Sequence, residues 1–159
     1  MRLALAAVVV LGCSGGGTEP DGPNHVTGVV QGNRFNGVAA AYWIGKPSAG
    51  SPPVIVFLLE DYLDCATISQ FNWDKTIGNS QVLEMSAPQL DARTFTVRSE
   101  ATVAYLRGEY NPDAGSGQLT ISTVTPMVNL VGTFSATFTG SDVLDGAFDA
   151  QYCASGVEP

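Results

Sequence analysis

From Val26 onward the chain consists of short runs rich in β-branched and aromatic residues, separated by Gly, Pro, Asn and Asp. No stretch repeats its apolar residues at the helical period, whereas alternation with a period of two is frequent. We therefore expect an all-β fold, with antiparallel neighbours closed as a β-sandwich or small β-barrel of about eight to ten strands. The expected strands are residues 26–30, 34–44, 54–60, 65–71, 81–86, 94–98, 101–110, 117–125, 129–139 and 143–153.

The most regular alternation lies in residues 129–139, where every second residue is apolar or glycine and most residues between them carry a hydroxyl. This pattern predicts one face toward the core and one toward water. Turn residues at 139–142 and at 111–117 predict two hairpins. By contrast, residues 54–59 are continuously apolar, which predicts a strand buried on both faces or one whose outer face meets a partner.

Size and charge limit the classes of partner. The chain has 159 residues, and we expect residues 26–159 to form one domain. Its formal net charge of −8 argues against a nucleic-acid partner, because phosphate neutralisation needs cationic patches. No apolar run reaches the roughly 18 residues that span a bilayer as a helix, so membrane association would require an anchor.

The first residues have the order of a secretory signal, with Arg2, an apolar stretch over 3–11, and then Gly12 and Cys13. The tetrapeptide Val10-Leu11-Gly12-Cys13 resembles the lipobox of bacterial lipoproteins. The resemblance implies that residues 1–12 are a signal peptide and that Cys13 becomes the acylated first residue of the mature protein, carrying fatty acids such as palmitate. Several acyl chains make such an attachment effectively permanent.

Residues 13–25 are poor in apolar side chains and are expected to form a tether with a span of about 15 to 20 Å. Ser14 resembles the residue type that permits sorting to the outer membrane. The resemblance therefore implies a cell-envelope location, with the outer membrane of a Gram-negative bacterium favoured and the leaflet open. A buried N-terminal strand with an incidental Cys13 is the alternative.

The chain also resembles a loosely defined group of short all-β envelope lipoproteins without an assigned activity. The resemblance implies a β-rich domain and adds nothing on chemistry. It rests on Gly28-Val29-Val30-Gln31-Gly32 with Phe35, on Gly132-Thr133-Phe134, and on Leu144-Asp145-Gly146-Ala147-Phe148 leading to Tyr152-Cys153.

Once Cys13 is acylated, Cys65 and Cys153 remain as an even pair in an oxidising compartment. We expect a disulfide between them; two separate buried thiols are the alternative. A metal site on these cysteines is disfavoured, because the chain has no Cys-x-x-Cys and only one His.

Nothing in the sequence indicates a nucleophilic active site. His25 lies at the end of the expected tether, and the Gly-x-Ser-x-Gly match at residues 12–16 spans the expected cleavage point. A glycan hydrolase using paired carboxylates remains an alternative, with Glu84, Glu100 and Glu109 as candidate residues.

A calcium site is conceivable at acidic loop residues, although the EF-hand pattern is absent and such clusters more often keep a surface wet. The residues concerned are Glu60, Asp61, Asp64, Asp142 and Asp145. We expect no metal and no cofactor.

Aromatic residues beside a proline-rich stretch could contact a ligand, because aromatic side chains are enriched at interfaces. Tyr42 and Trp43 precede this stretch, and Trp73 could stack on a sugar. The alternative is that Trp43 closes one end of the β core. Together these features predict a lipid-anchored, non-catalytic binding or structural module with an envelope protein or glycan as partner. A glycan hydrolase and a carrier of a small apolar ligand inside a closed barrel are the alternatives.

Overall fold

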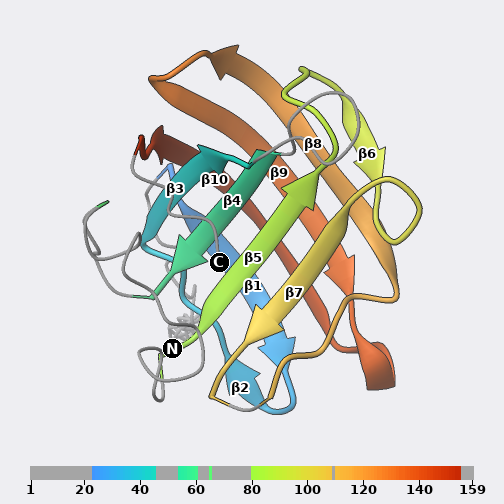
Figure 1. The fold of residues 1–159 in the computed structure, drawn as a ribbon. Coiled ribbons are helices and arrows are strands. Elements are labelled where there is room, and N and C mark those ends of the chain that lie inside the picture. The colour runs from blue at the N-terminus through green and yellow to red at the C-terminus, as the bar shows by residue number, and fades with distance from the viewer. Residues whose placement is uncertain (1–22, 46–53, 61–64, 66–79, 109, 155–159) are drawn as a thin grey trace, which may run out of the picture.

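The computed structural model describes residues 23–45, 54–60, 65, 80–108 and 110–154. These residues form one curled sheet that makes a half-barrel, as Figure 1 shows, and the expected all-β fold is confirmed. Within these ranges no helix has the length and apolar character needed to cross a bilayer. The strands are β1 (His25–Val30), β2 (Asn33–Arg34), β3 (Ala39–Ile44), β4 (Val54–Leu59), β5 (Val82–Ala87), β6 (Thr94–Thr96), β7 (Thr102–Leu106), β8 (Ser116–Thr125), β9 (Asn129–Thr137) and β10 (Val143–Tyr152); a 3-10 turn, η1 (Thr139–Ser141), links the last two.

The strand order is β6-β8-β9-β10-β3-β4-β5-β7, and β1 pairs with both β10 and β2. All neighbours are antiparallel except β10 and β3, which pair in parallel through Gln151 with Ala41 and Tyr152 with Tyr42. The expectation of a purely antiparallel sheet is therefore too narrow. The cause is that β1 pairs antiparallel with the first half of β10. The chain reverses after β1, so β3 returns along the second half of β10 in the same direction as β10.

The β7 end of this strand order is linked to β9 at a seam, which we define as the segment 112–115 and the strands on either side of it. The amide of Ala114 donates to the carbonyl of Val103 in β7 at 2.8 Å, and the amide of Gly115 donates to the carbonyl of Thr137 in β9 at 2.8 Å. The segment thus bridges the open edge of β7 to β9.

The prediction of a hairpin turn at residues 111–117 is wrong. The chain reverses earlier, where Arg107 and Tyr110 exchange backbone hydrogen bonds of 3.0 and 3.1 Å. Residues 112–115 instead run extended beside β7, and β8 pairs with β9 and β6. Turn-forming residue types are also accepted by an extended segment at a sheet edge, which explains the error.

Two apolar clusters lie on opposite faces of the sheet. The inner cluster fills the half-barrel, and its largest fully buried side chains include Tyr42, Phe35, Phe95, Tyr105 and Phe148. The outer cluster covers β3 and β4. Both faces of β4 are therefore buried, as its continuous apolar run predicts. The buried members of the outer cluster are Ala41, Trp43, Phe57, Leu59, Val82 and Cys153.

Two glycines and two phenylalanines interlock the strands β9 and β10. Gly132 pairs with Phe148, and Gly146 pairs with Phe134. A Cβ added to Gly132 would lie 3.0 Å from a ring carbon of Phe148, and one added to Gly146 would lie 2.7 Å from a ring carbon of Phe134. Each aromatic ring thus covers the glycine of the opposite strand, an arrangement that pins strand register.

The expected alternation in 129–139 and the hairpin at 139–142 are both confirmed. Leu130, Phe134 and Phe138 are buried, and β9 and β10 pair along nine residues of register. The first strand begins at His25, one residue before the expected start, and the amide of Asp149 donates to the side-chain oxygen of Asn24 at 2.8 Å. The last two residues of the expected tether therefore belong to the folded domain.

Candidate functional site

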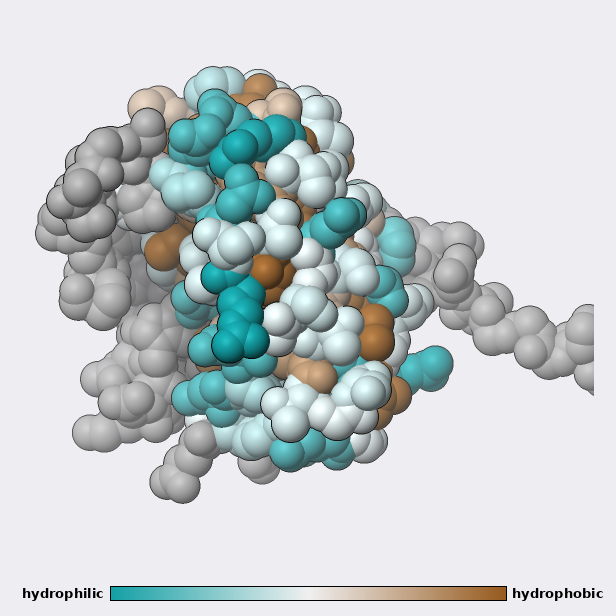
Figure 2. Space-filling model, turned by 90° about the vertical axis from the view of Figure 1, so that its right-hand side faces the viewer, coloured by the Kyte–Doolittle hydropathy of each residue, from teal (hydrophilic) through white to brown (hydrophobic). Residues whose placement is uncertain are grey.

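A cleft of about 550 Å³ opens at the seam. Its walls come from the turn between β6 and β7, from segment 112–115 and from the end of β9, while Val103, Ala114 and Phe138 supply apolar surface. Figure 2 views the side of the molecule on which β6 lies, and its surface is mostly hydrophilic or of intermediate hydropathy, with apolar residues scattered. The polar side chains that line the cleft are Arg98, Thr102, Asp113, Ser116, Thr137 and Thr139.

Arg98 lies in a strained turn beside the cleft. Its φ of 77° is in the left-handed region, which costs a non-glycine residue about 1 to 2 kcal/mol. The turn is closed by the amide of Arg98, which donates to the carbonyl of Ala101 at 2.7 Å, and by the amide of Ala101, which donates to the carbonyl of Thr96 at 3.1 Å. The exposed guanidinium of Arg98 makes no ion pair with any described residue. The turn therefore holds an available cation at the cleft.

Glu100 stabilises the same turn and does not line the cleft. Its carboxylate accepts the amide of Thr96 at 2.8 Å and lies 3.6 Å from the guanidinium of Arg93. The hydrogen bond from Thr96, and in smaller part the charge of Arg93, lower the pKa of Glu100. Of the three glutamates considered for catalysis, Glu100 thus has a structural partner, and Glu109 lies outside the described residues.

Glu84 is brought near a carboxylate that sequence reasoning missed. In the sheet register Glu84 of β5 stands opposite Ala104 of β7, and Ala104 stands opposite Asp113 at the seam. The two carboxylates therefore flank a small side chain in one row. Burial raises the pKa of Glu84, and the negative charge of Asp113 raises it further. Only the pairing of segment 112–115 with β7 reveals this neighbour, since 28 residues separate Asp113 from Glu84 in the sequence.

The two described aromatic residues expected at a ligand site are both buried and lie on opposite faces of β3. Trp43 is 8% exposed and stacks on Phe57 with ring centroids 4.1 Å apart, in the outer cluster. Tyr42 is fully buried in the inner cluster, 5.3 Å from the ring of Tyr152. Neither residue lines the seam cleft. Trp73 lies outside the described residues.

The hydroxyl of Tyr42 is buried and makes no hydrogen bond of ordinary geometry with the described residues. Burial raises the pKa of Tyr42, and the nearby backbone amides of Met127 and Val128 oppose this rise. The hydroxyl therefore lies beneath the turn between β8 and β9.

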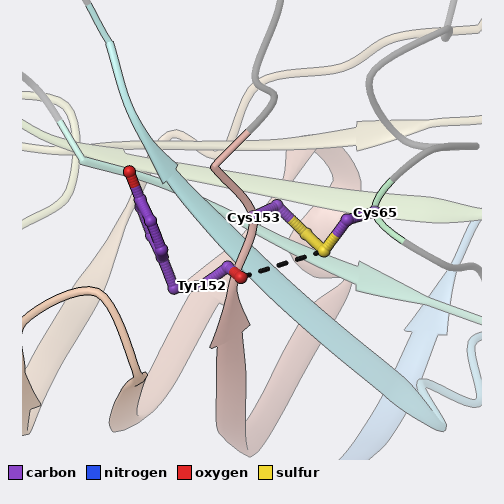
Figure 3. Close-up of a disulfide and its surroundings, with 3 residues drawn as sticks. All are labelled: Cys65, Tyr152 and Cys153. Carbon is purple, nitrogen blue, oxygen red and sulfur yellow. Dashed lines mark hydrogen bonds between the residues drawn. A yellow bond between two sulfur atoms is a disulfide. The ribbon is translucent and has the colours of Figure 1, made fainter.

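Cys65 and Cys153 form a disulfide, as expected from the cysteine count, with their Cα atoms 5.3 Å apart (Figure 3). The Sγ atom of Cys65 also lies 3.8 Å from the carbonyl oxygen of Tyr152. A disulfide sulfur carries no proton, so this is a packing contact rather than a hydrogen bond. Cys65 has helical backbone geometry rather than that of the expected strand over 65–71, whose other residues lie outside the described ranges.

Two of the acidic residues considered for calcium, Glu60 and Asp142, have other partners in the structure. The carboxylate of Glu60 accepts the side-chain amide of Gln81 at 2.6 Å, and that of Asp142 accepts the amide of Gln31 at 2.7 Å. Within the described residues no group of three or more His, Cys, Asp or Glu side chains is placed to hold a metal ion. Asp61 and Asp64 lie outside these ranges.

The interior of the half-barrel bears on the carrier alternative. Side chains of the inner cluster occupy it, including Phe35, Phe95 and Tyr105, each 0% exposed. The cleft of about 550 Å³ lies instead at the seam, where polar side chains share its lining with the apolar surface of Val103, Ala114 and Phe138. The described geometry thus directs attention to a polar ligand at the seam.

Comparisons with protein-family models, with curated proteins and with solved structures find no match to this chain.

Proposed function

We propose that the chain is a lipid-anchored β-domain of the cell envelope that binds a glycan in the seam cleft without transforming it. The observation that carries the proposal is the strained Arg98 at the mouth of a cleft rich in hydroxyl groups. Unfavourable backbone conformations concentrate at functional sites, where the surrounding structure holds them in place. A guanidinium held at such cost and left without a partner is available to a ligand.

The chemistry of the cleft suits a sugar. Thr and Ser hydroxyls both donate and accept hydrogen bonds, a carboxylate accepts from neighbouring sugar hydroxyls, and a guanidinium donates in a fixed fork. Arg98 and Asp113 carry opposite charges, which favours a neutral glycan over a strongly anionic one. A volume of about 550 Å³ is within the range of about 300 to 1,000 Å³ found for small-ligand sites.

The envelope location rests on the lipobox resemblance at Cys13. The disulfide between Cys65 and Cys153 supports it, because stable disulfides are typical of oxidising compartments. Mass spectrometry of the native protein tests the anchor: we expect a chain that begins at Cys13 and carries the mass of its acyl groups. An intact leader on an unmodified Cys13 would overturn this part of the proposal.

The binding test separates function from stability at Arg98. Arg98→Gly removes the guanidinium and also relieves the left-handed strain, so we expect unchanged or slightly higher stability. Loss of a charge-assisted hydrogen bond, worth about 1.5 to 3 kcal/mol, should weaken glycan binding by roughly 10- to 150-fold. A simple fold defect would lower stability and binding together.

The measurement is a titration of the chain with peptidoglycan disaccharides and neutral oligosaccharides. Binding is monitored through the NMR chemical shifts of the backbone amides. We expect shifts at Gly115 and Ser116, which border the cleft, and none at Gly32. Arg34→Gly, at an exposed arginine in β2, is the matched control and should bind normally. The proposal fails if no sugar shifts Gly115, or if Arg98→Gly binds as well as the native chain.

A second candidate function is glycan hydrolysis by Glu84 and Asp113. The observation that favours it is the raised pKa of Glu84, which lies two strands from the carboxylate of Asp113 in the same row of the sheet. Two strand spacings separate their backbones by about 9 to 10 Å, and inverting glycosidases hold their carboxyl groups about 6.5 to 9.5 Å apart. Glu84 would be the general acid and Asp113 the base.

Release of reducing ends from envelope polysaccharides tests this alternative. Glu84→Gln should abolish turnover, whereas Glu100→Gln, which alters a carboxylate in the neighbouring turn, should not. Equal turnover in both variants, or none in the native chain, would reject hydrolysis.

A further inference from the structure

The turn between β8 and β9 presents two adjacent apolar side chains to solvent. Met127 is 70% exposed and Val128 is 56% exposed. We call residues 125–129 the hairpin tip; they are Thr, Pro, Met, Val and Asn, with no charged side chain. The residue of β10 that pairs with Asn129 is the neutral Gln151. The hairpin tip can therefore leave water without desolvating a charge of its own.

The backbone holds these two side chains outward. The amide of Val128 donates to the carbonyl of Thr125 at 3.0 Å, and Met127 has a left-handed φ of 58°. The carbonyl of Val128 accepts the amide of Tyr152 at 2.9 Å, which ties the hairpin tip to the end of β10. The apolar side chains thus sit on an ordered turn.

The folded domain begins at the same end of the molecule. The side chain of Asn24 accepts the amide of Asp149, and the carboxylate of Asp149 accepts the side-chain amide of Asn129, each at 2.8 Å. Asn24 and the hairpin tip are therefore linked through a single residue of β10. In Figure 1 the turn between β8 and β9 lies at the top, beside the end of β10.

Ten residues separate Cys13 from Asn24 in the sequence. A chain of that length and composition has a root-mean-square span of about 15 to 20 Å. The eight steps of β9 from Asn129 to Thr137 cover about 26 Å. A lipid on Cys13 would therefore favour the end that carries the hairpin tip over the opposite end, where Arg34, Glu60 and Asp142 lie.

We infer that Met127 and Val128 insert into the interface of the phospholipid bilayer that holds the acyl groups of Cys13. The inference rests on the acylation proposed above. The inserted hairpin tip orients the domain, and it holds the part of the cleft formed by the end of β9 about 25 Å from the lipid surface. The anchor supplies attachment, and the hairpin tip supplies orientation.

The experiment uses the full acylated chain in phosphatidylcholine bicelles that contain a gadolinium-chelating lipid. Paramagnetic broadening of backbone amide signals reports closeness to the lipid surface. The amide of Val128 should lose several-fold more intensity than that of Val38. Val38 is the matched reference, because it is 53% exposed, apolar and placed immediately before β3, away from the hairpin tip.

Substitution then tests the side chains themselves. A double variant with Met127→Ser and Val128→Ser should lose most of the broadening at Asn129 while keeping its acyl groups and its fold, which the unchanged signals of the inner cluster report. Val38→Ser should leave the broadening at Asn129 as it is.

The outcomes separate this inference from the proposed anchor. An unmodified Cys13 in the native protein overturns both. An acylated chain whose Val128 and Val38 amides broaden equally, or whose double variant broadens like the native chain, overturns the insertion of the hairpin tip alone.

Discussion

Replacing Gly146 by Ala tests the interlock between β9 and β10 most directly. The added Cβ would lie 2.7 and 2.9 Å from two ring carbons of Phe134 and would also collide with the backbone carbonyl of His25. Real Cβ atoms do not approach other heavy atoms this closely. Because one obstacle is the backbone of β1, moving the Phe134 ring alone cannot relieve the overlap.

The size of the effect is the difference of two terms. Overpacking a well-packed site costs about 1 to 3 kcal/mol, and the fixed backbone of His25 puts Gly146→Ala in the upper part of that range. Alanine also restricts the unfolded chain more than glycine does, which stabilises the folded state by about 0.4 to 1 kcal/mol. We expect a net loss of about 2 kcal/mol, or roughly 8 °C in the melting midpoint of a domain of this size.

Chemical denaturation followed by tryptophan fluorescence measures this loss. Gly115→Ala is the matched control, because its added Cβ would come no closer than 3.8 Å to a heavy atom; it should be neutral or slightly stabilising. Phe134→Leu replaces the ring over Gly146 by a smaller side chain. In that background Gly146→Ala should lower the free energy of unfolding by at least about 0.5 kcal/mol less than in the native chain. A loss below about 0.5 kcal/mol for the single variant, or strict additivity with Phe134→Leu, would refute the interlock.

Three further predictions concern stability. Breaking the disulfide with Cys65→Ala and Cys153→Ala should cost about 4 to 5 kcal/mol in denaturant unfolding, because it opens a loop of 88 residues; an unchanged midpoint would contradict this. The raised pKa of Glu84 means that its contribution to stability is present below the unfolded pKa and is lost as pH rises through the folded pKa. Glu84→Gln should therefore raise the unfolding free energy at neutral pH but not in acid, and a pH-independent difference would count against this assignment. Tyr42→Phe removes a buried hydroxyl without a partner and should stabilise the domain by about 1 kcal/mol in thermal unfolding; a loss of stability would reveal a hydrogen bond at that oxygen.

The raised pKa of Glu84 and the strained Arg98 have no counterpart in the sequence pattern. The strain at Arg98 arises in the turn closed by Thr96 and Ala101, whereas the carboxylate of Asp113 reaches Glu84 through segment 112–115. The Pro, Asp and Gly residues of that segment predict a turn, and the segment instead runs along β7. Turn propensity is local, whereas the choice between a hairpin and an edge segment depends on which distant strand offers free backbone groups. The seam cleft could not be found before that choice was known.

The aromatic residues illustrate a different limit. Trp43 and Tyr42 are neighbours in an apolar run, and sequence reasoning gave them a shared role at a ligand site. Consecutive residues of a strand point to opposite faces. The structure places Trp43 in the outer cluster and Tyr42 in the inner one.

The sequence by itself determined the all-β class, the faces of β9 and the hairpin of β9 with β10. These features follow from a period of two and from adjacent turn residues, which short stretches of chain encode. The pairing of Cys65 with Cys153 was predicted only by assigning Cys13 to the lipid anchor, and the folded structure brings the two cysteines together. Tertiary structure alone decided the parallel contact of β3 with β10, the closure of the seam and the placing of Asn24 beside the hairpin tip. Each of these joins segments far apart in the chain, and such pairings are chosen by the total burial and hydrogen bonding of the folded sheet rather than by local preference.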